Sequence, residues 1–162
     1  MEPRELFIQA IAQLMYVETA LADEVLPDLR QQVSEPRFQR ALDEHLEQTR
    51  EHVARLEQVF EDIKVQAQRE PTAAFDGLRR DHEQGVGRLT DRTLRDLFNA
   101  SAAAHTEHFE ISAYHSAISL AVVLGLPEAV KCLEQNLHEE EEALEKVEKA
   151  IPELLTGQLA PA

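Results

Sequence analysis

Apolar residues recur every three or four positions in four long segments of this chain, which is the spacing of one buried face of an α-helix. The pattern is clearest in residues 4–32. There the apolar positions are Phe7, Ile11, Leu14, Leu21, Val25 and Leu29. Only 5 of the 162 residues are glycine, and the alternating β-branched and aromatic runs typical of strands are missing. The sequence therefore predicts an all-α protein.

The other three segments begin and end at recognisable signals. They span residues 34–66, 91–124 and 127–155. Ser34 is the expected N-cap of the first of these, with Pro36 in its first turn. Gly125 and Pro127 end one helix and open the next. Short connections of this kind favour antiparallel neighbours.

One connection is long enough to change the topology. Residues 67–90 contain Pro71 and three of the five glycines, so we expect a crossover that holds a short helix. Such a crossover can travel the length of the bundle and make segments 34–66 and 91–124 parallel, as in the ferritin-like arrangement of an antiparallel four-helix bundle. We expect a single domain over residues 1–162, with a flexible tail over about 157–162.

Charge and cysteine content exclude several classes of protein. The formal net charge is −15, whereas binding to nucleic acid or to an anionic membrane surface needs clustered Lys and Arg. No segment approaches the roughly 18 consecutive apolar residues of a membrane span. The single Cys132 cannot form an internal disulfide and suits a reducing compartment. We therefore expect a cytoplasmic protein with neither a nucleic-acid nor a membrane partner.

The buried faces of the four segments carry polar residues where Leu, Ala or Val is expected. Glu18, for example, completes the apolar series between Leu14 and Leu21. The polar residues assigned to these faces are Glu18, His52, Glu107, Glu110 and Glu140. A buried charge without a partner costs several kcal/mol even after relaxation, so these side chains conflict with an ordinary core.

A bound metal would resolve this conflict. Carboxylate oxygens and imidazole nitrogens on facing helices are the ligands of iron and manganese in metal-binding bundles. Glu107 and Glu110 are three residues apart and lie on one side of a helix, and Tyr114 continues that face. The sequence thus predicts a site for one or two iron or manganese ions.

Nearby polar residues are given structural roles. His45 is expected at the boundary between the buried and exposed faces of its helix rather than at the metal. The acidic run over residues 138–149 is expected to be a solvated face on which only Glu140 points inward. Glycine-rich phosphate loops, paired cysteines and nucleophile motifs are missing, and Cys132 is interpreted as a packing residue.

Four stretches of the chain resemble a known family. These stretches are ELFIQAIAQLMYVETAL near the start, HLEQTREHVARLEQVFE from His45, EHFEISAY from Glu107 and LGLPEAVKCLEQNLHEEE from Leu124. They are similar to the YciE/YciF-type bacterial stress-associated proteins of the ferritin-like superfamily, and together they touch all four long helices.

The resemblance implies an antiparallel four-helix fold, a homodimer and a di-iron-like site, without a settled activity. It supports the same five candidate ligands. Two departures from the wider ferritin-like pattern matter. Thr49 stands where a Glu-x-x-His motif would supply its Glu, and Ala143 and Leu144 stand where the last helix would supply further ligands. The second metal position therefore has few ligands.

Three functions remain to be separated. The leading hypothesis is a metal-binding bundle in stress or oxidant handling, with peroxide or oxygen as the small substrate to test. The alternative is a non-enzymatic, metal-free structural or interaction bundle whose inward carboxylates are satisfied by His, Tyr or Arg. DNA protection by an iron-storing protein is disfavoured by the net charge of −15.

Overall fold

The computed structural model describes residues 1–159, and side chains through residue 156. The elements in this part of the chain are α1 (Pro3–Ala20), the π-helix η1 (Leu21–Val25), α2 (Leu26–Gln32), α3 (Pro36–Asp62), α4 (Ala73–Val86), α5 (Arg92–Val123) and α6 (Pro127–Leu159). Every element within residues 1–159 is helical, which confirms the all-α prediction.

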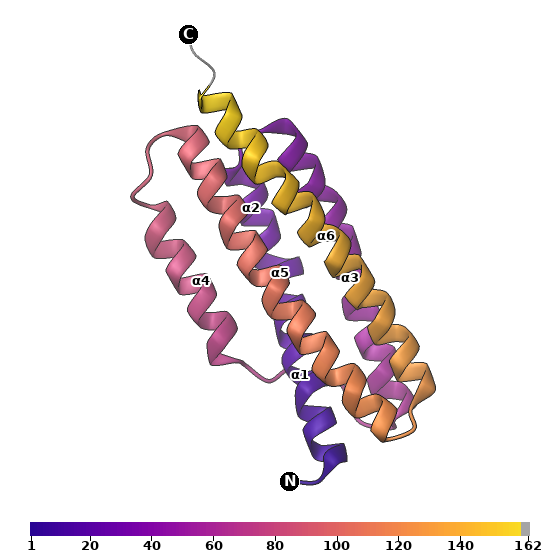
Figure 1. Ribbon diagram of the computed structural model, residues 1–162. Coiled ribbons are helices and arrows are strands. Elements are labelled where there is room, and N and C mark those ends of the chain that lie inside the picture. The colour runs from indigo at the N-terminus through magenta and orange to yellow at the C-terminus, as the bar shows by residue number, and fades with distance from the viewer. Residues whose placement is uncertain (160–162) are drawn as a thin grey trace.

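The long helices form a bundle with the expected topology (Figure 1). Helix α1 packs against α3 and α5, and α6 packs against the same two helices. The chain runs up through α1 and α2, down through α3, up through α4, down through α5 and up through α6 (Figure 1). Because α4 returns the chain along the outside of α5, α3 and α5 are parallel, as the length of the crossover predicted.

The turn between α2 and α3 differs from the prediction. Glu35, not Ser34, is the N-cap of α3, and its carboxylate accepts a hydrogen bond from Phe38 N at 2.6 Å. Ser34 instead donates its hydroxyl to Asp96 of α5 at 2.6 Å. Asp96 also accepts hydrogen bonds from the backbone N–H groups of Ser34 and Glu35, both at 2.9 Å. Glu35 thus caps α3 locally, while a buried carboxylate from a distant helix satisfies the backbone donors of the turn just before it.

Two helix ends use the same left-handed cap. At the end of α5, Gly125 has a φ of 66°, and the N–H of Leu126 reaches the carbonyl of Ala121. At the end of α3, Lys64 takes the same conformation with a φ of 57°, and α3 ends at Asp62 rather than near residue 66. The sequence does not indicate this helix end, because glycine is the usual residue at the left-handed position and Lys64 occupies it here.

The last helix is longer than predicted. Helix α6 continues to Leu159, past the expected end near residue 155, and includes Pro152. Part of the tail expected over residues 157–162 is therefore helical, while residues 160–162 lie outside the described residues. No helix in the described chain is both long and apolar enough to cross a membrane.

The segment predicted as one helix over residues 4–32 contains a wider turn. In η1 the N–H of Leu26 bonds to the carbonyl of Leu21, five residues earlier. Pro27 follows directly, and its ring lacks an N–H and would clash with the carbonyl of Asp23 in a regular α-helix. The wider turn absorbs this conflict.

Two apolar clusters make up the core. One contains Phe7, Ile11, Leu14, Leu56, Phe60, Ala117 and Leu133, and the other contains Val17, Leu21, Leu26, Phe38, Leu42, Ala100 and Val147. On each long helix a polar residue lies at the junction of the two clusters. On α1, for example, Glu18 follows Leu14 of the first cluster and precedes Leu21 of the second. A polar layer thus crosses the middle of the bundle.

Candidate metal centre

The polar layer receives side chains from α1, α3, α5 and α6. Its members are Glu18, His45, His52, Glu107, Glu110 and Glu140. Four of them have no exposed surface, while Glu107 and His45 are 4% and 6% exposed. The structure therefore buries all five residues that the sequence singled out, together with His45.

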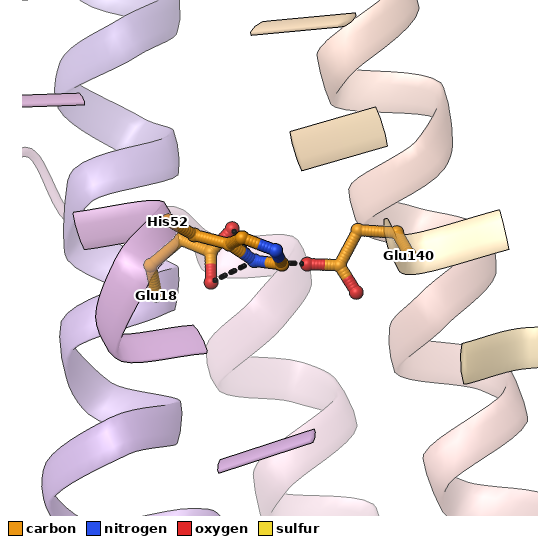
Figure 2. A group of neighbouring side chains, drawn as sticks. All are labelled: Glu18, His52 and Glu140. Atoms are coloured by element: carbon orange, nitrogen blue, oxygen red, sulfur yellow. Dashed lines mark hydrogen bonds and ion pairs between the residues drawn. The ribbon is translucent and has the colours of Figure 1, made fainter. Parts of the chain in front are cut away.

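A first group joins three helices (Figure 2). The Nδ1 atom of His52 lies 2.8 Å from Oε1 of Glu140 and 3.3 Å from Oε1 of Glu18. One ligand atom from each of the three residues lies within 4.8 Å of the other two. In Figure 2 the three side chains point toward one another. These residues could hold a metal ion between them.

A second group shares Glu140 with the first. The Nε2 atom of His45 lies 3.3 Å from Oε1 of Glu107 and 3.6 Å from Oε2 of Glu140. One ligand atom of each residue again lies within 4.8 Å of the others. His45, expected at the edge of the buried face, is therefore buried against two carboxylates. Its position, seven residues or two turns before His52, was the available signal that both rings share one face of α3.

Glu110 is buried in the layer but belongs to neither group of three. Both of its carboxylate oxygens lack a hydrogen-bond partner among the described residues. Burial raises the pKa of Glu110 well above its ordinary value, and the nearby charges of Glu140, Glu18 and Glu107 raise it further. This carboxyl is the least satisfied group of the layer.

Tyr114 and Asn136 close the layer on the side of Glu18. The hydroxyl of Tyr114 donates a hydrogen bond to Oε1 of Glu18, and Asn136 donates one to the Tyr114 hydroxyl at 3.0 Å. Tyr114 is fully buried. Burial raises the pKa of Tyr114 well above its ordinary value, and the charge of Glu18 adds to the shift. Tyr114 therefore orients Glu18 as a neutral donor.

The prediction that only Glu140 points inward from the acidic run of α6 is wrong, because Glu139 also contacts the polar layer. Its Oε2 atom lies 2.9 Å from Nε2 of His52 and accepts a hydrogen bond from Arg55, also at 2.9 Å. Metal-binding histidines commonly use their second ring nitrogen in this way, which fixes the orientation and tautomer of the ring. Glu139 and Arg55 are therefore positioning residues for His52.

At Thr49 and Ala143, where the sequence predicted that ligands are missing, the structure also places no carboxylate or imidazole. Thr49 is fully buried, and its hydroxyl donates to the backbone carbonyl of His45 at 2.8 Å. Ala143 is also buried and brings no polar atom to the layer. The centre is therefore asymmetric, with both histidines on α3 and the acids on the other three helices.

Raised pKa values of both carboxyl and imidazole groups follow from this crowding. Burial raises the pKa of Glu140 well above its ordinary value, and repulsion by Glu107 and Glu18 raises it further. Burial by itself lowers the pKa of His45 and of His52, but attraction by Glu107 and by Glu18, respectively, outweighs it, so both pKa values are raised. Without a cation, the layer retains protons to limit its negative charge.

The stability of the metal-free protein should therefore fall as the pH rises. The raised pKa values of Glu110 and Glu140 stabilise the fold fully below the ordinary pKa of Glu, and this contribution is lost as the pH rises toward the folded values. The histidines act in the same direction from about pH 6.5 upward. We expect a higher Tm at pH 6 than at pH 8 in the presence of EDTA. The free energy of unfolding should fall by about 1.4 kcal/mol per pH unit for each proton that the folded state retains and the unfolded state does not.

Replacing one of the protonated carboxyls tests the origin of this slope. Glu110→Gln removes a titrating group while keeping its shape, so its thermal unfolding should depend less on pH than that of the unsubstituted chain. A slope that is identical in both proteins would assign the pH effect to the general charge of −15 instead.

The donor set fits a hard or borderline divalent cation. Both oxygens of Glu140, Oε2 of Glu107 and the nitrogens of His45 have no hydrogen-bond partner among the described residues. The 2.8 Å approach of His52 to Glu140 therefore lacks hydrogen-bond alignment. Buried polar atoms of this kind are rare unless something satisfies them. Carboxylate oxygens and imidazole nitrogens without thiolates suit hard or borderline metal ions better than soft ones.

Known proteins are similar to this chain in sequence and fold. The family described as "Domain of unknown function (DUF892)" matches residues 2–160. Protein YciF of Escherichia coli K12 is 28% identical over 137 residues, covering 84% of this chain and 82% of that protein.

Solved structures agree with the comparison of sequences. The crystal structure of the E. coli stress protein YciF has a TM-score of 0.89 at 27% identity and covers 96% of this chain and 98% of that one. YcfI of Rhodopseudomonas palustris has the same TM-score, 0.89, at 28% identity, over 91% of this chain and 94% of that one. The expected resemblance is confirmed, and the chain belongs to the DUF892 family.

Proposed function

We propose that this protein binds one or two ions of iron or manganese in the polar layer. The observation that carries the proposal is the convergence of buried carboxylates and imidazoles from all four long helices, with unsatisfied oxygens on Glu107, Glu110 and Glu140. Glu140 would be the shared ligand, because it belongs to both groups of three. A cation would replace the protons that the metal-free layer retains.

The cellular role that we propose is stress or oxidant handling. It is supported by the similarity to YciF of E. coli, which is described as a stress protein. A redox-active metal would make peroxide or dioxygen the small substrate to test. We further propose a homodimer in the cytoplasm, a compartment that suits the single free thiol of Cys132.

A metal-free structural bundle is the second candidate, and specific contacts favour it. Tyr114 donates a hydrogen bond to Glu18, and the two histidines lie within ion-pair distance of Glu107 and Glu140. These partners satisfy part of the layer without any cation. Glu110, whose oxygens have neither a donor nor a cation among the described residues, is the residue that this alternative explains least well.

Metal addition should stabilise the protein strongly. A ligand that binds the folded state at a hundred times its Kd adds about 2.7 kcal/mol to the free energy of unfolding. For a chain of this length that corresponds to roughly 2–4 °C in Tm for each kcal/mol. We expect bound metal in protein purified without chelator, and a rise in Tm on titrating Fe(II) under anaerobic conditions, or Mn(II).

Two further measurements complete this test. EDTA should reverse the rise in Tm, and Mg²⁺ at the same concentration should give a smaller shift, because it favours octahedral sites of water and oxygen ligands. Less than about a tenth of a metal equivalent per chain, together with an unchanged Tm, would exclude the metal function and leave the structural bundle.

A further inference from the structure

The polar layer meets a surface cavity at Glu107. Glu18, His52 and Glu140 have no exposed surface, whereas Glu107 retains 4%. Glu107 also lines a cavity of about 100 Å³ between η1 and α2 on one side and α4 and α5 on the other. The surroundings of the bundle thus reach the layer on the side of the second group, which contains His45 and Glu107.

The walls of this cavity are mainly apolar. The buried wall residues are Leu21, Leu26, Leu29, Phe75 and Ala103. The exposed carboxylates of Asp28 and Glu83 belong to the outer part of the lining. Arg79, which also lines the cavity, is paired with Glu24 at 2.8 Å. An ion that entered would lose its hydration against hydrocarbon, so the lining selects against charged molecules.

Two local features open the space. The π-helix contributes Leu21 and Val25 from its widened turn, and α5 contributes Ala102 and Ala103. The two alanines leave unfilled the volume that larger side chains would occupy. Glu107, the residue of the polar layer that lines the cavity, has an Oε2 atom without a hydrogen-bond partner among the described residues. The cavity therefore adjoins a carboxylate of the layer.

We propose that this cavity binds a small uncharged molecule of low polarity, of the class of dioxygen, beside Glu107. An apolar cavity of about 150 Å³ holds benzene or xenon, so the smaller volume here suits a guest of a few atoms. A further step, in which the guest reaches a bound metal, rests on the proposed function. Binding of the guest in the cavity does not. The metal-free protein should therefore bind such a guest as well.

Xenon is the probe that tests this binding without any chemistry. We expect xenon, dissolved under pressure in a solution of the full metal-free chain, to cause saturable shifts of the backbone amide signals of Leu26, Ala103 and Glu107 in NMR spectra. Amide shifts that stay linear with pressure, or that are spread evenly over the molecule, would overturn the proposal, because they indicate nonspecific contact or a cavity filled with water.

Filling the cavity should abolish the effect. Ala102→Leu adds three carbon atoms to the α5 wall, and we expect it to weaken xenon binding about fivefold or more by removing free volume. Ala113→Leu is the matched control on the same helix, outside the cavity lining, and should bind xenon as the unsubstituted chain does. If Ala102→Leu fails to fold, Leu78→Phe fills the cavity from α4. Undiminished binding in a folded cavity-filling variant would overturn the proposal.

Metal content measured on the same proteins separates this inference from the proposed function. Absence of metal with saturable xenon binding would exclude the metal function and leave the cavity proposal standing. Normal metal content without xenon binding would exclude the cavity proposal and leave the metal function standing. With both confirmed, Ala102→Leu should retain its metal while losing the guest, since Ala102 provides no ligand atom.

Discussion

The substitution Glu140→Leu should abolish metal binding and stabilise the metal-free protein. Glu140 is the only residue common to both groups of potential ligands, so its loss breaks both. It is also fully buried, and its raised pKa reports how unfavourable its charge is there. The oxygens of Glu140 make no hydrogen bond among the described residues, so the substitution breaks none, and it removes the repulsion from Glu107 and Glu18. Replacing a whole buried ion pair with apolar residues is often neutral or stabilises a protein by about 1–4 kcal/mol. We expect a gain within that range in EDTA.

Two measurements check this result. Metal analysis should find less than about a tenth of the metal of the unsubstituted chain, and urea unfolding in EDTA should give the change in free energy. Glu141→Leu is the matched control, because Glu141 is the next residue of α6 and is exposed. It should change neither property appreciably. Equal metal content in both variants would show that the ion, if one binds, does not use Glu140.

The substitution Asp96→Ala should destabilise the fold by about 3–5 kcal/mol, because each donor left unsatisfied in a buried place costs about 1–3 kcal/mol. Asp96 is 2% exposed and accepts three hydrogen bonds from the turn between α2 and α3. Its removal would leave the N–H groups of Ser34 and Glu35 without acceptors in a partly buried place. Urea unfolding measured in EDTA would give the loss independently of metal.

A graded series identifies the cause of that loss. Ser34→Ala removes one of the three donors and should cost about 1 kcal/mol, whereas Asp81→Ala alters an exposed carboxylate on α4 and should have little effect. If Asp96→Ala costs no more than Ser34→Ala, the backbone hydrogen bonds at the turn do not anchor α3 to α5. Metal content per folded chain should be unchanged, because Asp96 lies about three turns before Glu107 on α5.

Much of the candidate site could be predicted because helical periodicity assigns each residue to a face. Glu18 and Glu140 have apolar neighbours three or four positions away on both sides, so any packing of their helices that buries those neighbours buries them too. The crossover length likewise favoured parallel α3 and α5, which the structure confirms. Burial confirms which way these side chains point, while their role as metal ligands stays a prediction.

Residues at the edge of a face could not be assigned in this way. His45 and Glu139 lie beside the apolar stripes of α3 and α6, where a small rotation of the helix decides between solvent and core. Contacts from other helices determine that both side chains point toward the core: Glu107 lies against His45, and the ring of His52 lies against Glu139. Periodicity along one helix carries no information about which partner approaches its edge.

The sequence by itself determined the all-α class, the four long helices and the buried positions of the acids, because these depend on spacing along one chain segment. Only the tertiary structure decided that Glu140 is shared by two groups, that Asp96 accepts hydrogen bonds from the turn before α3, and that Glu107 lines a cavity. Each of these depends on distances between side chains from different helices, which are fixed when the helices pack and not before.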